Sequence, residues 1–177
     1  QLVTIILSFL FVVTTDAQVL TPPTVQAGDF FTISIGNPLP VGEAGESMVW
    51  DYTQAQSIQN YSGQYYLANN STFKKDYPNA TWVTEINGGE YYYNFGPDIY
   101  EYYGGIEGGV SYPYTDSEEL YPYPFEYGQT HLDSSYNQII IQGELVNRNI
   151  ITNSVFDGYG TLNLPNEALY DDVCRIR

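Results

Sequence analysis

The stretch EYYYNFGPDIYEYY, Glu90 to Tyr103, places two aromatic runs on either side of Gly96-Pro97-Asp98. Tyrosine and phenylalanine are enriched in strands, whereas Gly, Pro and Asp are enriched in turns. The pattern therefore predicts a β-hairpin that turns at residues 96–98.

Strict alternation of side-chain character recurs on both sides of this hairpin. In residues 29–36, Phe31, Ile33 and Ile35 alternate with Thr32 and Ser34. Helical spacing of apolar residues is scarce, so we expect an all-β antiparallel sandwich or jelly roll with Ile33 and Trp50 in its core. The other predicted strands span 47–53, 80–86, 136–146 with a bulge at Gly143, 151–156, 160–165 and 171–177, with DGYG (157–160) as a turn.

The segment Tyr112–Gly128, YPYTDSEELYPYPFEYG, breaks this pattern. Pro113, Pro122 and Pro124 have no backbone N–H to donate to a central ladder. The sequence predicts a long Pro- and Tyr-rich surface loop here, with a single helical turn at Asp116–Leu120.

The first residues have the character of a secretory signal peptide. Leu2 to Val13 is an apolar run that is too short to cross a membrane as a helix. Small residues follow it, and we expect cleavage between Ala17 and Gln18. Residues 18–177 then form a single domain with no transmembrane span, secreted or held at the outer cell surface.

Charge limits the partners that this domain can have. Asp and Glu number 21 against 5 Lys and Arg, which gives a net charge of −16. Nucleic acid is excluded because binding to phosphates needs clustered cations, and anionic membranes are disfavoured for the same reason. Glycans and other surface proteins remain as partners.

Two stretches resemble a recurring group of exported proteins of Bacteroidetes. They are GEAGESMVWDYTQ, residues 42–54, and DGYGTLNLPNEALYDDVCRIR, residues 157–177. The resemblance implies that more strands follow, then a sorting domain for type IX secretion, so the domain is expected to be truncated at its C-terminus. It supplies no catalytic residues. Cys174 stands where that group usually has Leu, and its alternation with Ile176 predicts a structural role on the buried face of the last strand.

Catalytic chemistry finds little support in the residues. A single histidine, His131, and a single cysteine do not supply a triad or a zinc site. A glycosidase needs two carboxylates on either side of a cleft. Any chain with so many acids offers such pairs, so the signal is not specific. The most notable of these acids is Glu101, which lies between Tyr100 and Tyr102. We therefore assign no catalytic residues.

Two binding sites are predicted instead. Hard oxygen ligands suit Ca²⁺, and the candidate calcium cluster comprises Asp116, Glu118 and Glu119. Tyrosines of the hairpin would form an aromatic platform for a glycan, although packing of the sheet explains them equally well. This platform comprises Tyr91, Tyr93, Tyr100, Tyr102 and Tyr103.

The expected function is that of an exported, non-catalytic β module in adhesion, glycan contact or a structural role. The alternative is a secreted hydrolase that uses two carboxylates, or an accessory domain of one.

Overall fold

The computed structural model describes residues 18–37 and 39–177, so the predicted signal peptide, residues 1–17, lies outside the described residues. The described chain is almost entirely β. It contains two short 3-10 helices, η1 (Ala68–Asn70) and η2 (Lys74–Asp76). The strands are β1 (Val19–Leu20), β2 (Phe30–Gly36), β3 (Gly45–Asp51), β4 (Ser57–Leu67), β5 (Trp82–Ile86), β6 (Gly89–Phe95), β7 (Ile99–Glu107), β8 (Val110–Pro122), β9 (Phe125–Glu126), β10 (Thr130–Ile141), β11 (Glu144–Leu164) and β12 (Ala168–Ile176).

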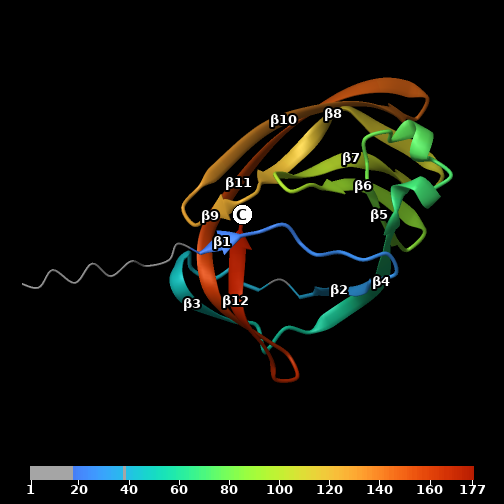
Figure 1. The fold of residues 1–177 in the computed structure, drawn as a ribbon. Coiled ribbons are helices and arrows are strands. Elements are labelled where there is room, and N and C mark those ends of the chain that lie inside the picture. Colours follow the sequence, from blue (N-terminus) through green and yellow to red (C-terminus); the bar gives the residue numbers. More distant parts are fainter. Residues whose placement is uncertain (1–17, 38) are drawn as a thin grey trace, which may run out of the picture.

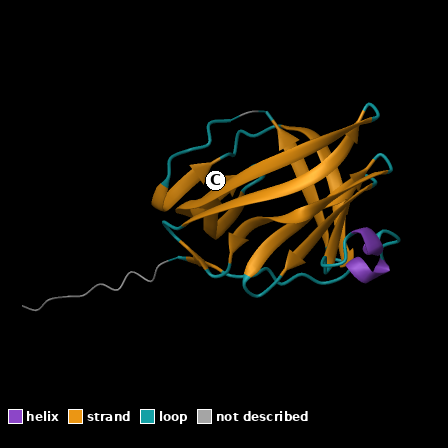
Figure 2. Ribbon diagram, turned by 90° about the horizontal axis from the view of Figure 1, so that it is seen from above, coloured by secondary structure: helices purple, strands orange, loops and turns teal. Residues whose placement is uncertain are grey.

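Ten of these strands form one sheet in the order β12-β11-β10-β8-β7-β6-β5-β4-β2, with β3 beside β11; β1 and β9 pair separately. The sheet curls so that the edge formed by β2 and β4 faces the part formed by β11 and β12 across an interior (Figures 1 and 2). Strand twist and the register shifts along β7 produce such curvature. The predicted all-β, sandwich-like architecture with antiparallel pairing is confirmed, except that β3 runs parallel to β11.

The hairpin predicted from residues 90–103 is present. β6 ends at Phe95, β7 begins at Ile99, and Phe95 pairs with Tyr100 across the turn. The β6–β7 hairpin is therefore determined by its own aromatic and turn residues.

The predicted Pro- and Tyr-rich surface loop is wrong. Most of residues 112–128 belongs to β8, which lies between β7 and β10, and no helical turn forms at 116–120. Pro113 pairs with Gly104 at a register shift, and Pro122 is the last residue of the strand, so neither breaks a regular ladder. Beyond it, Tyr123 and Phe125 are buried.

Three smaller expectations also need correction. Residues 136–146 are not one bulged strand, because β10 and β11 meet at a tight turn in which Gln142 and Gly143 have φ of 53° and 87°. The predicted turn at 157–160 lies inside β11, where the register shifts instead. Trp50 is buried as expected, with 5% of its surface exposed, but Ile33 is 40% exposed.

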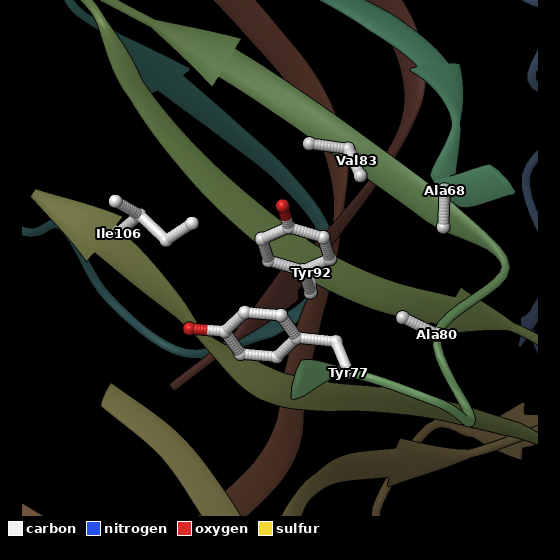
Figure 3. Packing of buried hydrophobic residues seen from close by; sticks show 6 residues of the cluster. All are labelled: Ala68, Tyr77, Ala80, Val83, Tyr92 and Ile106. Atoms are coloured by element: carbon white, nitrogen blue, oxygen red, sulfur yellow. The ribbon is translucent and has the colours of Figure 1, made fainter. Parts of the chain in front are cut away.

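The most deeply buried apolar cluster lies on the outer face of β5–β7, beneath the segment that carries η1 and η2 (Figures 1 and 3). Tyr77 stacks on Tyr92 with ring centroids 3.8 Å apart. The cluster comprises Ala68, Tyr77, Ala80, Val83, Tyr92 and Ile106. This packing leaves the other face of the same strands directed into the curve of the sheet.

Candidate functional site

The predicted tyrosine platform is divided between the two faces of the sheet. Tyr93 pairs with Tyr102, with ring centroids 5.1 Å apart, and Tyr100 lies 5.7 Å from Tyr93. Tyr91 shares their face because it stands two residues before Tyr93. Tyr103 packs against the outer cluster instead, next to the register shift between Tyr102 and Gly104.

Packing is the first role of the inner rings. Tyr93 and Tyr100 belong to a row of aromatic contacts along the interior, and burial raises the pKa of Tyr93 to about 12. The row continues through Phe31, Tyr65, Phe95, Tyr121, Phe125 and Phe156. Tyr93 and Tyr100, both half-buried, therefore pack against their aromatic neighbours on the inner face of the curved sheet.

Tyr91 and Tyr102 have a second role, because they also line an open pocket of about 470 Å³. We call it the tyrosine pocket. Its walls come from β6, β7, β8, β10 and β11. The other lining residues are Glu107, Val110, Tyr112, Tyr114, Ile139, Ile140 and Arg148. Pockets of this kind, with apolar and aromatic walls and a few polar groups, are the usual ligand sites of proteins.

Two tyrosine hydroxyls hold the carboxylate of Glu107 in this pocket. Tyr91 and Tyr112 donate to its Oε1 at 2.8 and 3.2 Å. Burial raises the pKa of Tyr112 to about 12, and the pKa of Tyr91 is raised as well, first by burial. Both hydroxyls therefore keep their protons at neutral pH. Within the described residues no hydrogen bond reaches Oε2 of Glu107, which leaves that oxygen for a ligand.

Arg148 supplies a cation to the same pocket. Its Nε donates to Oδ1 of Asn137 at 3.0 Å, and its Nη2 donates to the hydroxyl of Tyr114 at 3.0 Å. The guanidinium carbon lies 5.6 Å from the centroid of the Tyr114 ring. Because Asn137 is fully buried, this arrangement fixes the position of the guanidinium group.

A second open pocket, of about 620 Å³, adjoins the first because Tyr91 and Glu107 line both. Its far wall includes Ile33 and Ile35 of β2 and Tyr61 of β4. The exposure of Ile33, unexpected for a core residue, is explained by its place in this wall. A ligand longer than the tyrosine pocket has apolar surface along which to continue.

The acidic residues of the predicted calcium cluster have separate partners along β8. Asp116 is exposed and pairs with Tyr136 of β10. Glu118 accepts a hydrogen bond from Thr152, and Oε2 of Glu119 lies 3.6 Å from Nε2 of His131. Among residues 18–37 and 39–177 no three His, Cys, Asp or Glu side chains converge on one point. Calcium binding stays a prediction from the sequence.

Glu101, the acid noted for a glycosidase, does not line the tyrosine pocket. Its Oε2 accepts hydrogen bonds from Asn94 Nδ2 at 3.1 Å and from the Tyr103 hydroxyl at 2.9 Å. Tyr103 belongs with the outer cluster, so Glu101 lies on the side of the sheet away from the pocket.

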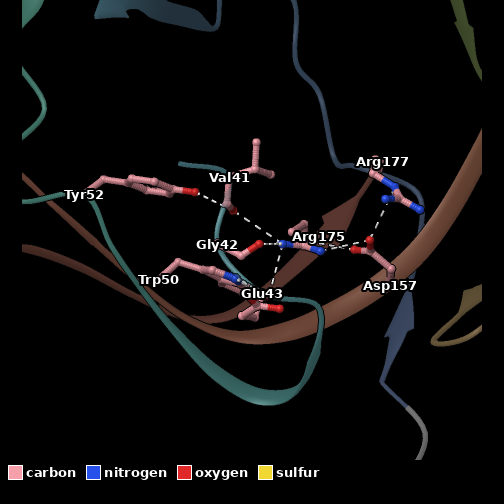
Figure 4. Close-up of polar contacts among 8 residues, drawn as sticks. All are labelled: Val41, Gly42, Glu43, Trp50, Tyr52, Asp157, Arg175 and Arg177. Atoms are coloured by element: carbon pink, nitrogen blue, oxygen red, sulfur yellow. Dashed lines mark hydrogen bonds and ion pairs between the residues drawn. The ribbon is translucent and has the colours of Figure 1, made fainter. Parts of the chain in front are cut away.

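The two sequence stretches 42–54 and 157–177 meet in the structure, where they contact each other through strand pairing and hydrogen bonds. β3 pairs with β11 so that Trp50 lies opposite Leu162. Trp50 Nε1 donates to the carbonyl of Glu43, and Arg175 donates to the same carbonyl at 3.0 Å (Figure 4). The hydroxyl of Tyr52 donates to the carbonyl of Val41. The bond from Arg175 holds the segment before β3 against β12, and the bonds from Trp50 and Tyr52 hold it against β3 and the residue that follows β3.

The sequence did not reveal most of the pocket. Arg148 is distant in sequence from Glu107, and Tyr112 and Tyr114 lie in the segment for which the sequence predicts a loop. One signal was present: Gly108-Gly109 is a typical hairpin turn. Recognising it would have placed Tyr112 on the strand next to Glu107.

No protein-family model, no curated protein and no solved structure matches this chain. In the part of the chain that the structure describes, every helix is too short or too polar to span a membrane. The geometry of the tyrosine pocket is therefore the main guide to function.

Proposed function

We propose that this domain is an exported, non-catalytic module that binds a glycan in the tyrosine pocket. The observation that carries the proposal is the convergence of Tyr91, Tyr102, Tyr112 and Tyr114 with Glu107 and Arg148 around one open pocket. The pocket is lined by strands of one sheet, so its shape is preorganised for a ligand.

The chemistry of the lining matches that of a sugar. A sugar ring presents an apolar C–H face, which packs on an aromatic ring, and hydroxyl groups around its edge. Tyrosine supplies both a flat ring and a hydroxyl, and the Glu107 carboxylate accepts hydrogen bonds from sugar hydroxyls. Tyr112 joins the two functions, since its ring lines the pocket and its hydroxyl holds Glu107.

Binding is favoured over hydrolysis by the number of carboxylates. Glycosidases place two carboxylates about 5–10 Å apart around the scissile bond. Among the described residues that line the tyrosine pocket, Glu107 is the one acid. The proposal is therefore a binding module that acts in adhesion or surface contact.

Export is part of the proposal, and the apolar run Leu2–Val13 supports it. N-terminal sequencing of protein recovered outside the cell should begin at Gln18. A mature protein that retains Leu2–Val13 would contradict this part of the proposal and leave the binding site untouched.

The binding test is a glycan array followed by calorimetry on the best ligand. Tyr112→Ala should weaken binding at least about tenfold, because it removes a stacking surface and a bond to Glu107. The matched control is Tyr170→Ala, at a 52% exposed tyrosine of β12, which should bind as the wild type does. Absence of binding to any glycan contradicts the proposal. Turnover of a bound glycan that disappears in Glu107→Gln would favour a hydrolase.

A further inference from the structure

The three arginines of this chain differ in their partners, and Arg148 stands apart. Arg175 and Arg177 both lie beside the carboxylate of Asp157. Of the two lysines, Lys74 donates to three backbone carbonyls and Lys75 is exposed. Among the described residues no carboxylate lies within ion-pair distance of Arg148. This is unusual in a chain with 21 acidic side chains, because a partly buried guanidinium is normally paired with one of them.

Neutral groups hold Arg148 in place without neutralising its charge. The amide oxygen of Asn137 and the hydroxyl of Tyr114 occupy Nε and one N–H of Nη2. Arginine carries five N–H donors, so donors on both terminal nitrogens remain for a ligand. Asn137 is itself fully buried, and its Nδ2 has no hydrogen-bond partner among the described residues. A buried amide N–H without a hydrogen-bond partner lowers the stability of the fold. The amide oxygen of the same side chain orients the Arg148 guanidinium.

From this arrangement we infer that the glycan bound in the tyrosine pocket carries a carboxylate, as in a uronic acid, and that Arg148 pairs with it. The inference rests on the proposed function and specifies its ligand class. A planar carboxylate matches two parallel N–H groups of a guanidinium, and charge-assisted bonds of this kind are stronger than neutral ones.

The negative charge of the protein does not prevent this pairing. At physiological ionic strength the screening length is about 8 Å, so acids elsewhere on the surface act weakly on a ligand beside Arg148. Glu107 is the acidic residue of the pocket, and two hydroxyl donors already bond to its Oε1. Glu107 suits the hydroxyl groups of the sugar, while Arg148 suits its carboxylate.

The test compares two ligands that differ in one group: an oligogalacturonate and its methyl ester, titrated calorimetrically into the domain. The wild type should bind the acid at least about tenfold more tightly than the ester. Arg148→Gln should remove this preference. Arg148→Lys should restore part of it, because lysine returns the charge without the two parallel N–H donors of the guanidinium. Arg177→Gln, at a side chain 74% exposed, is the matched control and should keep the preference. Thermal unfolding of each variant verifies that it is folded, and the acid–ester comparison on the wild type needs no variant.

The outcomes separate this inference from the function on which it rests. Equal binding of acid and ester, with both lost in Tyr112→Ala, overturns the carboxylate inference and leaves glycan binding in place. A preference that survives in Arg148→Gln refutes the role of Arg148, and tighter binding of a sulfated oligosaccharide refutes the carboxylate. Binding of no glycan at all removes the proposed function and the inference together.

Discussion

Arg175 and Asp157 form a bidentate ion pair between β12 and β11, in which Nε and Nη2 donate to the two carboxylate oxygens at 2.7 and 2.9 Å. Both side chains are largely buried, with 16% and 12% of their surface exposed. The guanidinium carbon also lies 5.8 Å from the Trp50 ring centroid, and Nη1 donates to the carbonyl of Gly42. One ion pair thus joins two strands and the segment that precedes β3.

Removal of one partner of this pair should destabilise the domain. Asp157→Asn leaves the Arg175 guanidinium largely buried without its counter-charge, which we expect to cost about 2 kcal/mol of unfolding free energy. Urea denaturation measures this loss. Asp116→Asn, at an exposed aspartate, is the control and should stay within about 0.5 kcal/mol of the wild type. Equal losses in the two variants would show that the ion pair does not stabilise the fold.

The ion pair between Arg175 and Asp157 should make the unfolding free energy depend on pH in the acidic range. The hydrogen bonds from Arg175 hold the pKa of Asp157 below its ordinary value of 3.8. A lowered folded-state pKa adds stability that is complete above the unfolded-state value and is lost as pH falls through the folded-state value. The difference in urea midpoint between wild type and Asp157→Asn should therefore shrink as the pH falls below 3.8. A difference that stays constant from neutral pH to pH of about 2 contradicts this mechanism.

Gly160 should tolerate no side chain. An added Cβ would lie 1.9 Å from the carbonyl oxygen of Met48, the residue that faces Gly160 where β3 runs parallel to β11. We expect Gly160→Ala to cost more than about 3 kcal/mol, since backbone must move. The comparison is Gly108→Ala, where φ is +57° and no atom lies within 4 Å of the new Cβ. There only the left-handed conformation is penalised, by about 1 kcal/mol. Similar losses at both sites would refute the close approach of the two strands.

The outer cluster should depend on Tyr77 through both its ring and its hydroxyl. The ring stacks on Tyr92, and the hydroxyl donates to the carbonyl of Gly105. Tyr77→Phe removes the bond to Gly105 and the hydrogen bond that the hydroxyl shares with Ser111, and should cost about 1–2 kcal/mol. Tyr77→Ala also opens a cavity and should cost about 4 kcal/mol. Chemical denaturation gives both values. If Tyr77→Phe were as damaging as Tyr77→Ala, the ring would contribute nothing beyond its hydroxyl.

Cys174 should react slowly with thiol reagents in the native state. Its side chain is half-buried on β12, opposite Tyr159, and burial raises the pKa of its thiol, so little thiolate is present at neutral pH. Unfolding in urea should speed the reaction greatly. Cys174→Ser should cost about 1 kcal/mol, since only part of the side chain leaves water. Labelling at equal rates in native buffer and in urea would contradict the assignment.

Local sequence was sufficient for the elements that depend on neighbouring residues. Alternation with period two predicted strands at 29–36, 47–53 and 80–86, which overlap β2, β3 and β5, and Gly-Pro-Asp predicted the hairpin turn at 96–98. Trp50 was correctly placed in the core. These features follow from side chains that alternate across a strand and from turn residues, both of which act over a few positions.

Tertiary structure alone decided which strands meet around the tyrosine pocket and which face of the hairpin is turned into the curve of the sheet. Tyr102 and Tyr103 lie on opposite faces because successive side chains alternate across a strand, and Tyr103 packs against the outer cluster. Pairing with β7 and β10 made a strand of the segment around Pro113, which local rules assigned to a loop. Arg148 meets Tyr114 only because three strands lie side by side. Long-range pairing and sheet curvature are properties of the whole sheet, so no short window of sequence contains them.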